Sequence, residues 1–329
     1  MNHPSPLSLL PSRIIHADWS LNPNKRWMGS ATLQPNGRYR LGTPQPVGAL
    51  DHFLSRLKAE SGTDACLLVG FDFPIGLPGA FALQAGITDF LSALPGFGLG
   101  EWGEFYTVAE TADQITLKRP FYPARPGNTR RLHLVNQLGL ADFNDLRRLC
   151  ELPRSGRRAA CPLFWTMGAQ QVGKAAICGW HDVLTPGLLD PALDLAIWPF
   201  SGQLAELLHP GRVIVTETYP AEYYADVLTD PDSPAQSSHF SKRKIQNLQQ
   251  CAPQMLHWAE SHNLELEPVL RESIKAGFGP PSAGEDAFDT TIGLFGMLSV
   301  ILGHQTPVEP RDEVIRRIEG WILGQPVPS

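Results

Sequence analysis

The chain has 329 residues, of which 43% are hydrophobic and 18% charged, so it can bury a substantial core and is not a disordered polymer. Its formal net charge of −6 excludes a generally basic nucleic-acid coat, although a local basic groove remains compatible with it. Thirty glycines and thirty prolines predict long connecting loops.

Cysteine usage and hydropathy point to a cytoplasmic protein. The five cysteines are scattered and form no C-x-x-C pair, which argues against a disulfide scaffold and against structural zinc. The longest apolar run, residues 292–303, is too short to span a bilayer. The N-terminal residues lack the pattern of a secretory signal. We therefore expect a soluble protein without a membrane partner.

The first part of the chain predicts the order β-β-β-α-β. Asn36-Gly37 separates two strand-like runs and predicts a hairpin. The run CLLVGFDF is continuously apolar and stops at Pro74, as a fully buried strand does. Since the helix supplies a crossover to a parallel strand, the sheet is mixed. The predicted strands cover residues 13–20, 27–34, 38–41 and 66–73, with a helix around residues 50–57.

The rest of the chain predicts one domain, residues 1–329, with a large insertion over residues 78–210. This insertion is rich in proline and glycine and contains helical stretches. A buried strand and two long helices follow it. The helical stretches of the insertion are residues 142–150 and 168–179, and the later elements are a strand at 212–218 and helices at 242–258 and 285–302.

Three acids, Asp18, Asp72 and Glu217, stand at or near the C-terminal ends of three apolar runs. An acid in a buried strand is costly unless it is paired or bound to a cation. Open α/β sheets also place their ligand sites at the carboxyl ends of strands. These acids are therefore candidate site residues.

Asp286 and Asp289 are three residues apart and share one face of the last helix. The apolar sequence after them predicts that this helix is buried, and Gly293 and Gly296 allow it to lie close to the sheet. We expect this arrangement to bring both acids towards the strand ends.

Several carboxylates that meet at one point cannot all be ionised without a compensating cation, and hard oxygen ligands suit Mg²⁺ or Mn²⁺. Each acid also has a structural explanation. Asp18 could form an Asx-turn, Asp72 could be a turn residue before Phe73-Pro74, and Asp286 could be a helix cap. The joint occurrence at three strand ends and one helix start favours a shared site.

These features resemble the ribonuclease H-like superfamily. Three segments also resemble the domain-of-unknown-function family 429, with the middle third of the chain only loosely covered: FDFPIGLP at 71–78, ETYPAEYY at 217–224 and EDAFDTTIGL at 285–294. The resemblance implies a ribonuclease H-like mixed sheet flanked by helices, with a large helical insertion. It also implies a nuclease-like activity by analogy with Holliday-junction resolvases, whose last helix carries a D-x-x-D pair. It marks Asp18, Asp72, Glu217, Asp286 and Asp289, and Thr290 stands where the family often has Ala.

Two glycine motifs do not support a phosphate loop. The G-x-x-x-x-G-K match ending at Lys174 lacks the final Ser or Thr that would hold Mg²⁺, so we favour a helix whose Gln170, Gln171 and Lys174 face a groove. The G-x-G-x-x-G match at 98–103 does not follow a strand. Basic residues gather at 118–131, at 147–158 and at 242–244, where a solvated face competes with nucleic-acid contact.

Together these patterns predict a Mg²⁺- or Mn²⁺-dependent phosphodiester hydrolase that acts on nucleic acid. In this hypothesis Asp18 bridges the metal ions, and Asp72 and Asp289 complete their ligand shells. Glu217 or Asp286 orients or deprotonates the water, while Lys174, Lys242 or Arg243 neutralises the phosphate. One alternative is a nucleotide-binding or nucleotide-hydrolysing protein of the same fold. Another is a non-catalytic binding module whose acids are structural.

Overall fold

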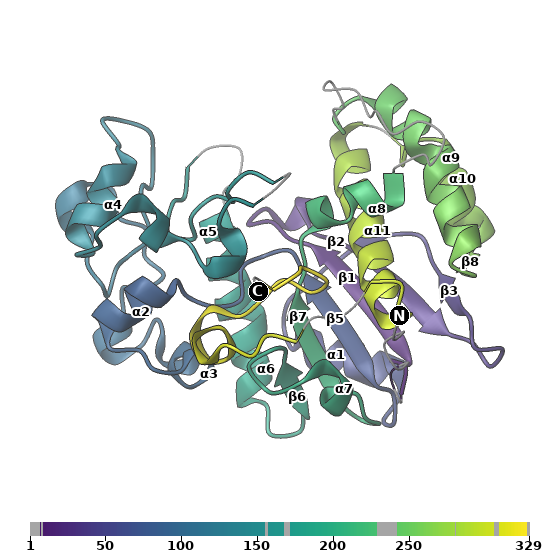
Figure 1. Cartoon of the computed structure of the whole chain (residues 1–329), viewed down its shortest axis with the longest axis horizontal. Coiled ribbons are helices and arrows are strands. Elements are labelled where there is room, and N and C mark those ends of the chain that lie inside the picture. Colours follow the sequence, from purple (N-terminus) through teal and green to yellow (C-terminus); the bar gives the residue numbers. More distant parts are fainter. Residues whose placement is uncertain are drawn as a thin grey trace.

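A mixed β-sheet lies at the centre of the protein (Figure 1). The structure is a computed structural model that describes residue 7 and residues 9–154, 157–167, 172–228, 242–279, 281–305 and 309–327. Within these residues the strands are β1 (Arg13–Asp18), β2 (Trp27–Leu33), β3 (Tyr39–Leu41), β4 (Gln45–Pro46), β5 (Leu67–Phe71), β6 (Leu195–Ile197), β7 (Val213–Glu217) and β8 (Glu265–Leu266).

The strand order is β6-β7-β5-β1-β2-β3-β8, with β4 paired to β2. Strands β1, β5, β7 and β6 are parallel neighbours, whereas β1, β2 and β3 are joined as antiparallel hairpins. The predicted α/β class is therefore confirmed. The parallel pairs place the carboxyl ends of β1, β5 and β7 at one edge of the sheet.

The predicted hairpin and crossover helix are confirmed. Gly37 adopts a φ of 79° in the turn between β2 and β3, and the Gln34 N–H donates to the Arg38 carbonyl at 2.8 Å. Helix α1 (Phe53–Ser61) then leads to β5. Strands β6 and β8 were not predicted, since runs of three and two residues carry no alternation of hydrophobicity.

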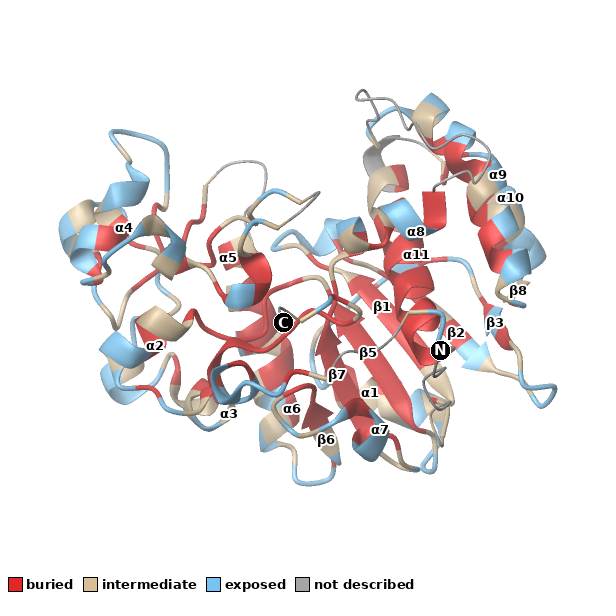
Figure 2. Ribbon diagram, in the orientation of Figure 1, coloured by how far each residue is buried: buried red, intermediate tan, exposed pale blue. Residues whose placement is uncertain are grey.

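Helices cover both faces of the sheet (Figures 1 and 2). Helix α11 (Pro281–Ile301) packs against β1 and β2, and α1 lies on the opposite face. Side chains alternate between two apolar cores: Ile14 and Leu68 belong to the core under α11, whereas Ile15 and Val69 belong to the core under α1. Outside α11 lie α8 (Tyr224–Leu228), α9 (Ile245–Ser261) and α10 (Pro268–Lys275).

The residues between β5 and β6 form a lobe beside the sheet (Figure 1). Its apolar side chains, such as those of Phe81 and Phe90, belong to the same core cluster as the α1 face of the sheet. The predicted insertion also supplies the edge strand β6. The helices of this region are α2 (Gly79–Ala85), α3 (Phe90–Ala93), α4 (Arg131–Gln137), α5 (Val172–Gly179), α6 (Thr185–Leu189) and α7 (Leu204–Leu207).

One of the two helical predictions in the insertion needs correction. Residues 142–150 do not form one helix but two short 3-10 turns, Phe143–Leu146 and Leu149–Glu151, because Arg147 between them has an extended backbone with φ −114° and ψ 148°. The helix predicted over 168–179 is present as α5, whereas Gln170 and Gln171 lie outside the described residues. No helix in the described part of the chain is long and apolar enough to cross a membrane.

Two glycines set the close approach of α11 to its neighbours. A Cβ at Gly293 would lie 2.2 Å from Nε2 of His16, and one at Gly296 would lie 2.1 Å from the ring of Tyr223. His16 is on β1, two residues before Asp18. The missing side chain at Gly293 therefore lets α11 lie directly on β1, which brings the start of the helix to the carboxyl end of that strand.

We predict that Gly293→Ala lowers the free energy of unfolding by about 1–3 kcal/mol, because the added methyl forces the buried His16 ring or the helix to move. Gly96→Ala is the matched control, since a Cβ at that position meets no atom within 4 Å. Urea unfolding of both variants measures the difference. Equal losses in the two variants would contradict the close packing of α11 on β1.

Candidate functional site: carboxyl groups at the ends of β1 and β5

The carboxyl groups of Asp18 and Asp72 meet at the carboxyl ends of β1 and β5. Ala17 and Phe71 are opposite each other in this parallel pair, so the residues that follow them are neighbours. The two half-buried side chains are hydrogen-bonded to each other. The Trp19 N–H also donates to Oδ1 of Asp72 at 2.6 Å, which fixes the orientation of that carboxyl group.

Both carboxyl groups are harder to ionise than usual. Burial, and next the charge of Asp72, raise the pKa of Asp18 well above its ordinary value. Burial also raises the pKa of Asp72 to about 6, although the hydrogen bonds from Asp18 and the Trp19 N–H oppose the shift. The pair therefore holds a proton at a pH where isolated aspartates have lost theirs, as expected for carboxyl groups that lack a cation.

Helix α11 brings two more acids to this pair, as the D-x-x-D spacing predicted. The charges of Asp289 and Asp286 both act on Asp18 and contribute to its raised pKa, after burial and Asp72. Asp289 is buried, and the hydroxyl of Tyr224 donates a hydrogen bond to it. Asp286 is half-buried, and burial raises its pKa. Four aspartates from β1, β5 and α11 thus lie in one region.

Lys242 is the cation that compensates these acids in the structure. Its ammonium group donates to Asp289 and lies 3.4 Å from Oε1 of Glu285. Burial alone lowers the pKa of Lys242, but Asp289 and Glu285 raise it above its ordinary value. One ammonium group balances one carboxylate, so the Asp18–Asp72 pair remains without a cation of its own among the residues that the structure describes.

The four aspartates have the ligand atoms that a divalent metal ion needs, but their side chains are not oriented to bind one. All the candidate ligands are carboxylate oxygens, which Mg²⁺ and Mn²⁺ prefer. Over the described ranges, however, no three His, Cys, Asp or Glu side chains are arranged to hold a metal ion. The physical reason is that Asp289 is turned to Lys242 and Tyr224. A metal site formed with Asp18 and Asp72 therefore requires Lys242 to release Asp289.

Glu217 does not join this cluster, which corrects the sequence prediction. Glu217 lies on the same face of the sheet as Val213 and Val215, which pack in the core under α1. Asp18 lies on the opposite face with Ile14, under α11. The alternation of a strand thus turns Glu217 away from Asp18 although both end parallel strands. Thr218, one residue later, lies beside Gly70 and Met297 on the α11 side.

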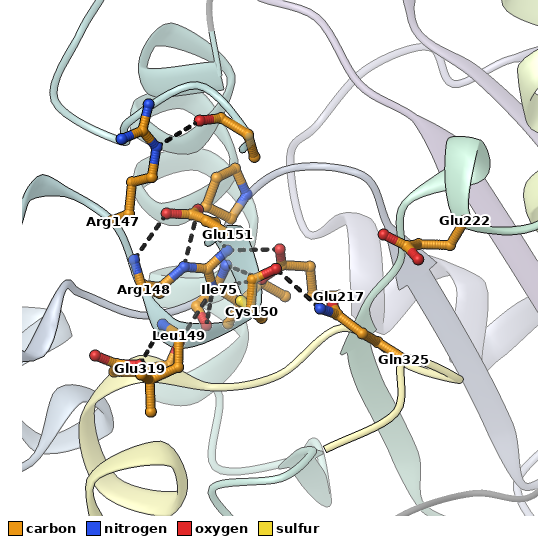
Figure 3. A network of polar contacts seen from close by, with 12 residues as sticks. Ile75, Arg147, Arg148, Leu149, Cys150, Glu151, Glu217, Glu222, Glu319 and Gln325 are labelled. Atoms are coloured by element: carbon orange, nitrogen blue, oxygen red, sulfur yellow. Dashed lines mark hydrogen bonds and ion pairs between the residues drawn. The ribbon is translucent and has the colours of Figure 1, made fainter. Parts of the chain in front are cut away.

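Glu217 is instead part of a buried ion network centred on Arg148 (Figure 3). Arg148 Nη1 and Nη2 donate to the two oxygens of Glu217 at 2.6 and 2.7 Å, and Arg148 also bonds Glu151. The Ile75 N–H donates to Glu217 at 2.7 Å. The carbonyl of Glu319 accepts from Arg148 at 3.0 Å. The network therefore joins β7, the inserted lobe and the C-terminal segment.

The other predicted residues fall in different places. Lys174 lies half-buried on α5 in the inserted lobe, and in the described part of the chain it has no hydrogen bond or ion pair with the four aspartates. Arg243 lies 3.7 Å from Glu285, at the edge of the Lys242 contact. Sequence reasoning missed Tyr224, whose signal was only its place in the segment ETYPAEYY after β7.

Several basic residues of the insertion are paired with acids. Each of three cations at 118–125 forms an ion pair with a glutamate of the same lobe, and two further arginines share one glutamate. The pairs are Lys118–Glu101, Arg119–Glu104, Arg125–Glu110, and Arg154 and Arg157 with Glu222. The 118–125 loop therefore presents little net positive charge for a nucleic acid.

Scans of the chain against protein-family models, against curated proteins and against solved structures found no match. The functional conclusion therefore depends on the geometry of the carboxyl cluster and of the residues around it.

We predict that Arg148→Leu lowers the free energy of unfolding by about 3–5 kcal/mol, because it leaves Glu217 buried without its cation. Urea unfolding measures the loss. Arg125→Leu, which breaks an exposed pair with Glu110, is the control and should cost less than about 1 kcal/mol. Adding Glu217→Gln to Arg148→Leu should recover part of the loss, because the buried charge is then removed. Similar losses for Arg148→Leu and Arg125→Leu would show that the network does not stabilise the fold.

Proposed function

We propose that the protein is a metal-dependent phosphodiester hydrolase of the ribonuclease H-like fold that acts on nucleic acid. The observation that carries this proposal is the meeting of the Asp18 and Asp72 carboxyl groups beside Asp289, at the carboxyl ends of two parallel strands. Buried carboxyl groups this close together are stable only when a bound proton or a cation neutralises part of their negative charge. A divalent cation supplies the charge and also the chemistry.

The order of elements supports the fold assignment. Two antiparallel hairpin connections, a crossover helix and a parallel strand come in the chain order β1, β2, β3, α1 and β5, with the two-residue β4 before α1. An acid ends β1, and a late helix packs on β1 and carries the D-x-x-D pair near its start. These are the features by which the sequence resembles ribonuclease H-like proteins.

In this proposal Asp18, Asp72 and Asp289 hold Mg²⁺ or Mn²⁺, which when bound activates a water and stabilises the leaving oxygen of the phosphodiester. Asp286 takes the role of orienting or deprotonating the water, because Glu217 is engaged by Arg148. Burial raises the pKa of Asp289, and the charge and hydrogen bond of Lys242 oppose that rise. Once Lys242 leaves Asp289, its ammonium group is available to a phosphate of the substrate.

Nucleotide binding or hydrolysis by the same fold is a second candidate function. The pairing of Lys118, Arg119 and Arg125 with glutamates favours it, because a long nucleic acid gains most of its affinity from unpaired cations. A nucleotide needs only the few cations near the carboxyl cluster.

We predict that Mn²⁺ raises the melting temperature of the parent protein and raises that of Asp18→Asn less. An ion that binds only the folded state at 100 times its Kd adds about 2.7 kcal/mol to the free energy of unfolding. Asp113→Asn, a change at an exposed aspartate of the inserted lobe, is the control and should respond like the parent. Equal Mn²⁺ shifts in all three proteins would remove Asp18 as a ligand.

The same variant tests the charge repulsion without metal. The pKa of Asp18 is raised in the folded state, so the folded protein holds this proton more tightly than the unfolded chain, and the contribution of Asp18 to stability falls as pH rises above about 4. In EDTA, Asp18→Asn should therefore lose less stability than the parent between pH 5 and pH 7.5. Melting temperatures measured at intervals of about one pH unit give the decline of each protein. A parallel decline in both proteins would contradict the repulsion.

Catalysis is tested with a mixed panel of DNA and RNA in Mn²⁺. Asp18→Asn should reduce cleavage by about 10³-fold or more, because one residue of a catalytic unit is lost, while circular dichroism shows an intact fold. Asp113→Asn should cleave like the parent. If the parent cleaves nothing with any divalent metal but is stabilised by a nucleotide, the nucleotide-binding function replaces the nuclease.

A further inference from the structure

Two arginines of the inserted lobe pair with a single glutamate that follows β7 and do not use all of their donors. Arg154 and Arg157 face each other across a short antiparallel bridge, and both form ion pairs with Glu222. Two guanidinium groups against one carboxylate leave a net positive charge. The side chains are 28% and 14% exposed, so a ligand can reach them.

The hydrogen bonds of these arginines do not use every donor of the two guanidinium groups. Nη1 of Arg157 donates to the Cys150 carbonyl at 2.9 Å and lies 2.8 Å from Glu222. Nη2 of Arg154 donates to Glu222, whereas its Nη1 is buried without a hydrogen-bond partner in the described residues. A buried donor without an acceptor is costly, and an anionic oxygen would satisfy it.

Tyr219 connects this pair to the carboxyl cluster. The guanidinium carbon of Arg157 lies 5.2 Å from the centre of the Tyr219 ring. The charges that act on the Tyr219 hydroxyl come from Arg157 and Glu222 on one side and from Lys242 and Asp72 on the other. The half-buried ring of Tyr219 therefore lies within range of the charges of both the arginines and the acids.

We propose that Arg154 and Arg157 bind a phosphate of a single-stranded nucleic acid next to the phosphate at the carboxyl cluster, and that the ring of Tyr219 contacts the nucleotide between them. Arginine presents a planar donor array that matches phosphate oxygens, and aromatic rings stack on bases without sequence preference. This inference builds on the proposed function, because the carboxyl cluster defines where the neighbouring phosphate lies.

The test is the binding of a fluorescein-labelled 12-nucleotide oligodeoxythymidylate to the full chain in EDTA, measured by fluorescence anisotropy over a range of salt. Arg157→Gln should weaken binding about tenfold and lower the slope of log K against log salt by about 0.7, the value of one phosphate contact on a single strand. Arg125→Gln removes an equal charge from the same lobe and should bind like the parent. Melting temperatures show whether each variant is folded.

A second variant covers the case in which Arg157→Gln fails to fold. Tyr219→Leu leaves the ion pairs with Glu222 intact and should weaken binding several-fold through the loss of stacking. Parent-like binding by Tyr219→Leu and by any folded Arg157→Gln would overturn the proposal. Competition with adenosine monophosphate distinguishes a strand from a mononucleotide as the source of the phosphate. If adenosine monophosphate displaces the oligonucleotide at an equal concentration of phosphate groups, a mononucleotide is the ligand and the assignment to a strand is overturned.

Failure of the proposed function gives a different result. If the parent binds the oligonucleotide through Arg157 but neither cleaves it nor responds to Mn²⁺, the hydrolase is wrong and the strand-binding site stands. If the parent cleaves in Mn²⁺ and Arg157→Gln binds and cleaves equally well, the hydrolase stands and the arginine site is wrong.

Discussion

The alternation of side chains along β1, β5 and β7 decides which acids form the candidate site. Asp18 follows the face of Ile14 and meets Asp72 under α11, whereas Glu217 follows the face of Val215 and meets Arg148. Because side chains in a strand alternate between the two faces of the sheet, an acid one position earlier or later lies on the opposite face. The same pleat thus produces a carboxyl cluster on one face and an ion network that anchors the inserted lobe on the other.

The sequence was sufficient to predict the strands that carry these acids and the helix that completes the cluster. Periodicity and the Asn-Gly turn indicated β1, β2, β3 and β5, and the D-x-x-D spacing placed Asp286 and Asp289 on one face of α11. Gly293 and Gly296 signalled the close packing of that helix, and the structure shows why: side chains there would collide with His16 and Tyr223.

The partners of the charged residues could not be predicted, since they depend on contacts distant in sequence. Nothing near Glu217 in the chain indicates Arg148, which lies 69 positions away, and the face of a strand end is ambiguous by one residue. The basic cluster at 118–131 suggested a nucleic-acid surface, but three of its five cations pair with glutamates within residues 101–110. Likewise, Lys242 was expected to contact phosphate, and in the structure it bonds Asp289.

The candidate site is therefore a set of acids whose charge is balanced in part by a lysine. Without metal, Asp289 is held by Lys242, and the raised pKa values of Asp18 and Asp72 keep that pair protonated to a higher pH than isolated aspartates. This arrangement explains how cation binding would reorganise the site, since a divalent ion and the ammonium group compete for the same carboxylate. Arg157 of the inserted lobe packs on the ring of Tyr219, which lies after β7 and is within range of the charges of Lys242 and Asp72.

A crystal structure of the protein with Mn²⁺ tests the central claim most directly, because manganese is located by its anomalous scattering. The account predicts manganese bound by Asp18, Asp72 and Asp289, at carboxylate distances of about 2.0–2.2 Å, with Lys242 moved away from Asp289. Manganese bound elsewhere, or an unaltered Lys242–Asp289 contact without manganese beside Asp18 and Asp72 at saturating concentration, would contradict it.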